Sequence, residues 1–348
     1  MFNRLLAIAA ITLATILPGC GDSSTPPAAN NGGASSMKVG MLVTGSTSDG
    51  GWNQLAADSI NKLAKDRGID VQILQQTPKD KAADALRQFD AKGYALVIAH
   101  GYEYLDVAKE LSDPKAKNPV KLKIAVSGGD AESPAFQSLL YDLGPASYQL
   151  GIIAAKVSKT GKLAFVGGAP FPTVTAMKRG FEAGAKSVNP AITVAEQYTG
   201  WDDPSKAKKQ VEAFIAQGVD VIMQNVDAAS SGVFEAVKEH NNPTVVTKEP
   251  TPVYTFGANS DQNNNPTASD YTLASAVIKL DVAFAKAIDE VKSNTFKGGI
   301  VKEDLSNGVA VAVLNPKLVG KVITPDTQKL LEDSAKKLAA GTITIPEK

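Results

Sequence analysis

The chain has 348 residues, of which 43% are hydrophobic and 21% charged, and its 36 basic and 36 acidic side chains cancel at pH 7. This composition is that of a globular protein, and the length allows one large domain or two smaller ones. Because no basic excess exists to attract phosphates, we expect no nucleic-acid partner.

An export signal is predicted at the N-terminus. Arg4 precedes an uncharged apolar stretch over residues 5–11, and the segment closes with Leu17-Pro18-Gly19-Cys20, which contains the chain's one cysteine. A positive start, a brief apolar run and a small-residue exit are typical of a signal peptide, and about 20 apolar residues would be needed to span a bilayer. The last four residues resemble the lipobox of bacterial lipoproteins, whose cysteine carries acyl chains such as palmitate. We therefore predict a signal peptide over residues 1–19 and lipidation of Cys20, with an ordinary secretory signal as the alternative.

A tether is predicted over residues 20–36. The stretch is rich in Ser, Gly, Ala, Asn and Pro and has no large apolar side chain to bury, so we expect it to be disordered. Folding is expected to begin near Lys38.

Strands and helices then alternate along the chain. In the first half, strands are predicted at 39–43, 71–74, 95–99 and 123–126, and helices at 55–64, 80–92 and 105–111. The series restarts with helices at 148–157, 173–187, 204–217 and 231–240, strands at 162–166, 192–198, 219–223 and 253–256, a long helix at 276–292 and a strand at 309–313. This alternation predicts an α/β fold of two doubly wound, mostly parallel sheets with a cleft between two lobes.

Ligands of open parallel sheets gather at the carboxyl ends of the strands, so the loops after the strands are the candidate sites. Asp49-Gly50-Gly51-Trp52-Asn53 follows the first strand and leads into a helix. Trp52 could stack on a flat ring or a sugar face, and Asp49 and Asn53 supply hydrogen bonds. The alternative is a tryptophan that caps the core, with Asp49 as a helix N-cap.

Later post-strand loops add further candidates. His100 lies at the end of the third strand, and a lone histidine in a sequence is more often a structural residue than a ligand contact. Tyr102, close to it, is the better candidate for a ligand contact. In the second half the candidates are Phe171, Asn225, Asp227 and Asn259. We expect Trp201 to cover the core and Asp202 to cap the helix at 204–217, and we assign no role to His240, at a solvated helix end.

No constellation of residues indicates catalysis. The sequence lacks a Cys–His pairing, a Gly-x-Ser-x-Gly elbow, a Walker-type phosphate loop and a His-Glu-x-x-His motif. We therefore predict a protein that is not an enzyme and that uses no cofactor and no metal.

Six motifs in order resemble the basic membrane protein family. They are the lipobox and the segments 49–54, 162–168, 180–185, 257–262 and 275–279. These proteins are lipoproteins similar to purine-nucleoside receptors of ABC importers, and the resemblance covers the chain from Lys38 to its C-terminal segment. It implies the type I periplasmic-binding-protein fold, two α/β lobes joined by a three-strand hinge. The lobes would comprise residues 37–143 plus 276–302 and residues 144–275 plus 303–348.

The resemblance also implies roles for particular residues. Trp52 would stack on the base, Asn53 would hydrogen-bond nearby, and Lys279 would reach the ribose hydroxyls. The chain departs from the family pattern at Asn259 and Ser127, where the family has aspartates, and in the loop 227–232. We keep Ser127 and Asn259 as candidate ligand contacts, although these departures weaken the ribose contact and remove an acceptor for purine N–H groups.

The predicted function is that of a lipid-anchored, extracytoplasmic solute-binding protein. It would bind a purine nucleoside or related nucleobase as a monomer, on the periplasmic or extracellular side of a membrane, and deliver it to ABC permease subunits. Two alternatives stay open: a receptor of the same fold that binds a pentose or hexose, and a sensory or adhesive surface lipoprotein that serves no transporter.

Overall fold

The structure is a computed structural model that describes residues 36–242 and 251–347. The predicted signal peptide, Cys20 and almost all of the predicted tether lie outside the described residues. None of the helices in the described part is both long and apolar enough to cross a lipid bilayer.

Six parallel strands form the first sheet, in the order β11-β5-β4-β3-β1-β2. Their bounds are β1 (Lys38–Val43), β2 (Asp70–Leu74), β3 (Leu96–His100), β4 (Lys123–Ser127), β5 (Gln137–Tyr141) and β11 (Gly299–Glu303). Alternate residues of the buried strands pack on opposite faces, as β1 shows: Met41 belongs to one core cluster and Leu42 to the other. Both faces are therefore apolar, which is typical of a parallel sheet covered on two sides.

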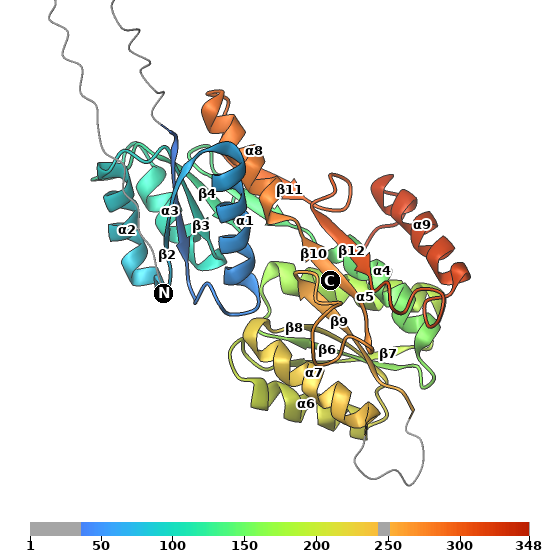
Figure 1. Ribbon diagram of the computed structural model, residues 1–348. Coiled ribbons are helices and arrows are strands. Elements are labelled where there is room, and N and C mark those ends of the chain that lie inside the picture. Colours follow the sequence, from blue (N-terminus) through green and yellow to red (C-terminus); the bar gives the residue numbers. More distant parts are fainter. Residues whose placement is uncertain (1–35, 243–250, 348) are drawn as a thin grey trace, which may run out of the picture. The chain divides into compact units, whose positions relative to one another are not determined.

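Helices cover both faces of the first sheet. On one face lie α1 (Trp52–Arg67) and α8 (Leu280–Lys292), which pack side by side (Figure 1) and are joined by ion pairs from Lys62 to Asp281 and from Arg67 to Asp289. On the other face lie α2 (Lys79–Ala91) and α3 (Leu105–Ser112), with the short 3₁₀ helix η1 (Tyr102–Tyr104) leading into α3. We call this assembly the first lobe.

The second sheet has the order β12-β10-β9-β8-β6-β7, and among its described strands only β10 and β12 pair in antiparallel fashion. Its strands are β6 (Lys162–Gly167), β7 (Thr193–Tyr198), β8 (Val221–Asn225), β9 (Tyr254–Asn259), β10 (Thr272–Ile278) and β12 (Ala310–Leu314). Its helices are α4 (Gly144–Val157), α5 (Pro172–Val188), α6 (Pro204–Ala216), α7 (Ser230–Asn241), α9 (Pro325–Ala339) and the 3₁₀ helix η2 (Asp227–Ala229). Figure 1 shows α6 and α7 side by side, and their apolar residues form one cluster with the sheet. We call this assembly the second lobe.

Glycines bring α4 and α5 into backbone contact. A Cβ on Gly184 would lie 1.9 Å from the carbonyl oxygen of Tyr148, and one on Gly180 would lie 2.1 Å from the carbonyl oxygen of Gly144. Only hydrogen fits in these places, because the obstructing atoms are backbone and cannot rotate away. The spacing of Gly180 and Gly184 in the sequence therefore reflects close packing of two helices in the second lobe.

The chain passes between the sheets three times. It crosses between β5 and α4, again between β10 and α8, and again between β11 and β12. The predicted doubly wound α/β fold is confirmed. The predicted lobe ranges stay predictions. Near two of their boundaries, β10 of the second sheet ends at Ile278 and β11 of the first sheet ends at Glu303.

Several sequence predictions differ from the structure. The helix predicted from residue 276 begins at Leu280, because Ala276 and Val277 pair with both β9 and β12, and Ile278 pairs with β12. Strands β5 and β11 and helix α9 were not predicted. Helix α4 begins at Gly144 rather than at Tyr148, since Pro145 suits the first turn of a helix.

Candidate functional site

A cavity of about 330 Å³ is lined by residues of both lobes. Its residues follow the carboxyl ends of the strands, where ligands of parallel sheets gather. Trp52 and Tyr102 follow β1 and β3 in the first lobe, and Phe171 and Trp201 follow β6 and β7 in the second. Four aromatic side chains from two lobes therefore meet in one cavity.

The first turn of α1 is held by Asp49. One carboxylate oxygen accepts hydrogen bonds from the N–H groups of Gly51 (2.9 Å) and Gln54 (3.0 Å), and the other accepts from the N–H (3.1 Å) and the Nδ2 (2.7 Å) of Asn53. The Oδ1 of Asn53 accepts from the N–H of Gly45 at 3.3 Å. Asp49 and Asn53 line the cavity as predicted candidates, and their polar atoms also fix the helix start. The N-cap is Gly51, so Asp49 binds the first N–H groups of the helix from two residues before the N-cap position that the sequence left open for it.

Three rings form a run across the two lobes. The centroids of Tyr102 and Phe171 lie 5.7 Å apart with an interplanar angle of 23°, and those of Phe171 and Trp201 lie 5.9 Å apart with an angle of 29°. Trp201 packs against the core, as expected, but it also lines the cavity, which the sequence analysis did not predict. A Cβ on Gly168 would lie 2.2 Å from the Trp201 ring, so this glycine lets the indole lie against the backbone.

The predicted cap by Asp202 is wrong. Asp203 holds that position, since its Oδ1 accepts from the N–H of Lys206 at 3.0 Å, while Asp202 lines the cavity. Proline is favoured at the first position of a helix, so the residue immediately before it is the expected N-cap. The position of Pro204 could therefore have identified Asp203, and not Asp202, as the capping residue.

Polar side chains of the second lobe meet at the ends of β8 and β9. The Nδ2 of Asn259 lies 3.2 Å from the Oδ1 of Asn225 and 3.2 Å from the Oδ1 of Asp227. Burial raises the pKa of Asp227 to about 7, and the nearby charge of Asp49 adds to the rise, whereas hydrogen bonds from the Trp52 backbone and from Asn259 oppose it. The cavity therefore contains a carboxyl group that changes its charge near neutral pH.

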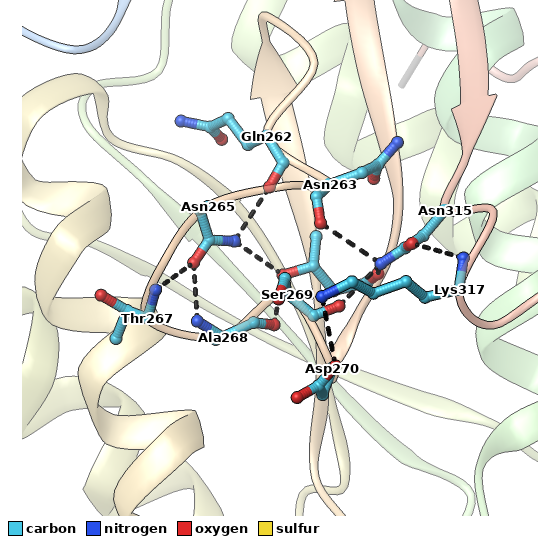
Figure 2. Close-up of polar contacts among 10 residues, drawn as sticks. Gln262, Asn263, Asn265, Thr267, Ala268, Ser269, Asp270, Asn315 and Lys317 are labelled. Atoms are coloured by element: carbon cyan, nitrogen blue, oxygen red, sulfur yellow. Dashed lines mark hydrogen bonds and ion pairs between the residues drawn. The ribbon is translucent and has the colours of Figure 1, made fainter.

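Asn259 is positioned by the loop that joins β9 to β10. The Oε1 of Gln262 accepts from the N–H of Ala258 and from the Nε2 of Gln224, each at 3.0 Å, which ties the loop back onto the sheet. Figure 2 shows the rest of the loop: Asn265 accepts from the N–H groups of Thr267 and Ala268 (3.2 and 2.7 Å), and Asn315 donates to the carbonyl oxygen of Ser269 (2.7 Å). These bonds explain why the segment is rich in asparagine without every asparagine being a ligand contact.

Two predicted contacts lie away from the cavity. Ser127 is fully buried at the end of β4, where its Oγ lies 2.8 Å from the Nδ1 of His100 and 2.9 Å from the hydroxyl of Tyr141. Lys279 is exposed immediately before α8, and its N–H donates to the carbonyl oxygen of Val309 at 2.8 Å. Neither residue is among the described residues that line the cavity, so a ligand contact by either one stays a prediction.

His240 lies in the last turn of α7, where its Nε2 is 3.0 Å from the carbonyl oxygen of Thr251, and nothing in this contact gives it a role in the cavity.

The described charged side chains that line the cavity are all acidic. Asp49, Glu103, Asp202 and Asp227 line it, and among the described lining residues there is no lysine, arginine or histidine. Glu103 and Asp202 were missed by the sequence analysis, although each stands beside an aromatic residue in a post-strand loop. Within residues 36–242 and 251–347, no group of three or more His, Cys, Asp or Glu side chains is arranged to hold a metal ion.

Residues 36–348 match the family described as "ABC transporter substrate-binding protein PnrA-like". The chain belongs to this family. The predicted resemblance is thereby confirmed, and the protein is a substrate-binding protein of the ABC-transporter type, an extracytoplasmic family that is not a family of enzymes.

Curated relatives agree with this assignment, and a solved structure shares the fold. The chain is 27% identical over 314 residues to basic membrane protein A2 of Borrelia garinii subsp. bavariensis, covering 89% of this chain and 88% of that protein. It is 25% identical over 363 residues to the ABC transporter nucleoside-binding protein BmpA of Lactococcus lactis subsp. cremoris, covering all of both. An ABC transporter solute-binding protein of Aeropyrum pernix has the same fold, with a TM-score of 0.76 and 23% identity over 90% of this chain and 94% of that chain.

Proposed function

We propose that this PnrA-like protein is a lipid-anchored receptor that binds a nucleoside or a related nucleobase in the cavity between its lobes and delivers it to an ABC permease. The observation that carries the proposal is the meeting of four aromatic rings with the amide and carboxyl groups of Asn225, Asp227 and Asn259 in one cavity. Flat faces suit a heterocyclic base, since base stacking on an aromatic side chain contributes about 1–3 kcal/mol, and the polar groups suit its edge and a ribose.

The charge of the cavity supports a ligand without a phosphate. Four carboxyl groups without a described lysine, arginine or histidine among the lining residues would repel an anion. A nucleoside or free base, which carries N–H and O–H donors and no negative charge, fits this lining, and a nucleotide does not. The name of the Lactococcus relative, a nucleoside-binding protein, agrees with this choice.

The anchor is proposed from the sequence. Cys20 closes a lipobox-like segment that precedes β1 in the sequence. Acyl chains on one cysteine give stable membrane attachment when more than one chain is present.

A thermal unfolding panel tests the ligand class. The mature protein, unfolded and refolded to remove any ligand that co-purifies, is heated with nucleosides, free nucleobases, nucleoside 5′-monophosphates, pentoses and hexoses. A ligand at 100 times its dissociation constant adds about 2.7 kcal/mol to the free energy of unfolding, which is a readily measured shift.

Each outcome of the panel has a defined meaning. Stabilisation by at least one nucleoside or nucleobase, and not by its monophosphate, is the expected result. Stabilisation by sugars alone would replace the proposal with a sugar receptor of the same fold, and equal stabilisation by nucleotides would contradict the charge argument. Stabilisation by none of the panel would favour a surface lipoprotein that serves no transporter.

A further inference from the structure

The indole of Trp52 rests on a buried imidazole. The rings of Trp52 and His100 are stacked with centroids 3.9 Å apart and an interplanar angle of 25°. The Nε2 of the same imidazole lies 3.1 Å from the carbonyl oxygen of Trp52. One side chain therefore contacts both the ring and the backbone of the residue that is proposed to stack on the ligand.

The hydrogen bonds define the tautomer of His100. A carbonyl oxygen can only accept, so the Nε2 of His100 must carry the proton that it donates to Trp52. The Nδ1 is then an acceptor, and it receives the Oγ–H of Ser127, whose oxygen in turn accepts from the hydroxyl of Tyr141. The donors run in one direction, from Tyr141 through Ser127 and His100 to the backbone of Trp52.

The parallel sheet brings these three side chains together. His100, Ser127 and Tyr141 are the last residues of β3, β4 and β5, and His100 pairs directly with Ser127 in the register of β3 and β4. All three are buried, with exposed fractions of 0%, 0% and 1%. Tyr141 also meets Trp52 edge to face, with centroids 5.8 Å apart, and Phe284 of α8 meets His100 in the same way at 6.1 Å.

We propose that His100, oriented by Ser127 and Tyr141, is a positioning residue that fixes the Trp52 indole in the orientation required to stack on the ligand. The inference rests on the proposed function, and it gives Ser127 a role other than the ligand contact that the sequence suggested. In this protein the polar group at the end of β4 acts on the stacking residue, and the side chains that touch the polar edge of the ligand come from the second lobe. Burial lowers the pKa of His100 to about 3, so the imidazole is neutral near pH 7 and its Nδ1 is free to accept from Ser127.

The test compares S127A and Y141F with matched controls. Ser138 and Tyr104 lie in the same lobe and are equally buried, but the Oγ of Ser138 donates to the carbonyl oxygen of Ala131 (2.7 Å) and the hydroxyl of Tyr104 donates to that of Thr77 (2.6 Å). S138A and Y104F therefore each remove one buried hydrogen bond that does not lead to Trp52. Each substitution is made singly in the wild-type protein. The dissociation constant of each variant is then measured by calorimetry with the nucleoside that stabilises the protein most in the thermal panel.

The expected result is a dissociation constant about five to ten times higher for S127A and Y141F, with little change for S138A and Y104F, while all four variants lose similar thermal stability. H100F, which keeps a ring but no hydrogen bond, should be at least as impaired. If H100F does not fold, S127A and Y141F still decide the matter. Equal affinities for the test and control variants would overturn the proposal.

A second measurement needs no ligand. The chain has two tryptophans, so W201F leaves Trp52 as the only indole. In that background, S127A and Y141F should shift the Trp52 emission and raise its quenching by acrylamide, and S138A and Y104F should not. If the thermal panel finds no nucleoside ligand, the proposed function fails while this measurement still tests the positioning of Trp52; unchanged emission in S127A and Y141F would refute the positioning itself.

Discussion

Asp227 of the second lobe lies against Gly51, the N-cap residue of α1 in the first lobe. The approach is close enough that a Cβ on Gly51 would lie 3.1 Å from the Oδ1 of Asp227. A carboxyl group with a raised pKa thus sits against a helix N-terminus across the two lobes, which makes this contact sensitive to pH.

We predict that D227N removes a pH-dependent part of the stability. The pKa of Asp227 is raised from 3.8 to about 7 in the folded protein, so the folded state holds a proton that the unfolded state has lost between these pH values. The contribution of Asp227 to stability therefore increases as the pH falls from 8 to 5 and is lost as the pH rises through 7. The free energy of unfolding of D227N minus that of wild type should be higher at pH 8 than at pH 5, by up to about 2 kcal/mol. Urea unfolding of both proteins at each pH measures this difference.

The comparison with the variant is necessary because His100 acts in the opposite direction. Its pKa is lowered from 6.5 to about 3, so the unfolded state gains the proton first and stability falls as the pH drops below 6.5. The wild-type profile alone would mix the two groups. A difference between wild type and D227N that does not vary between pH 8 and pH 5 would count against a raised pKa at Asp227.

We predict that W52A weakens ligand binding about tenfold to a hundredfold, because one aromatic stacking face contributes about 1–3 kcal/mol. W52F keeps a smaller face and should lose less than tenfold. Isothermal calorimetry with the best nucleoside of the thermal panel provides the measurement. Unchanged affinity in W52A would show that Trp52 does not stack on the ligand.

We predict that G184A destabilises the second lobe by about 3 kcal/mol. The added methyl would lie 1.9 Å from the carbonyl oxygen of Tyr148 in α4, and neither helix backbone can yield without moving the other. K186A, on an exposed turn of the same helix, is the control and should change the free energy of unfolding by less than about 0.5 kcal/mol. Similar urea midpoints for the two variants would contradict the close packing of α4 and α5.

We predict that C20S releases the protein from membranes. Wild-type protein should fractionate with membranes and incorporate labelled palmitate, whereas C20S should incorporate none and, once exported, should appear in the soluble extracytoplasmic fraction. A wild-type protein that is soluble and carries no label would indicate an ordinary secretory signal instead.

The sequence predicted the fold well because its signals are local. Each buried strand of β1, β3, β4, β6 and β8 is a short apolar run, and each helix between them carries an apolar face. The signal was ambiguous at Ala276–Ile278, where a short apolar run fits a strand and a helix equally, and only the pairing with β9 and β12 decides between them. β5 was missed because Gln137 and Ser138 interrupt its apolar pattern, although both are buried.

The site was predictable in outline and not in detail. All six of these predicted residues lie at or after the carboxyl end of a strand and line the cavity: Trp52, Tyr102, Phe171, Asn225, Asp227 and Asn259. The role of Ser127 was not visible, because its partners His100 and Tyr141 are distant in sequence and meet only through the register of three strands. Trp201 could be placed only once the ring of Phe171 was located beside it, and Asp202 only once the lining of the cavity was known.

The three passages of the chain between the sheets have a consequence for the order in which the protein can assemble. β11 completes the edge of the first sheet and β12 that of the second, and both follow α8 in the sequence. A nascent or translocating chain that has emerged only as far as Ile278 contains five strands of each sheet and a finished copy of neither. Both lobes therefore acquire their last strand only when the C-terminal part of the chain arrives, and no cut at a single point can separate one whole lobe from the other.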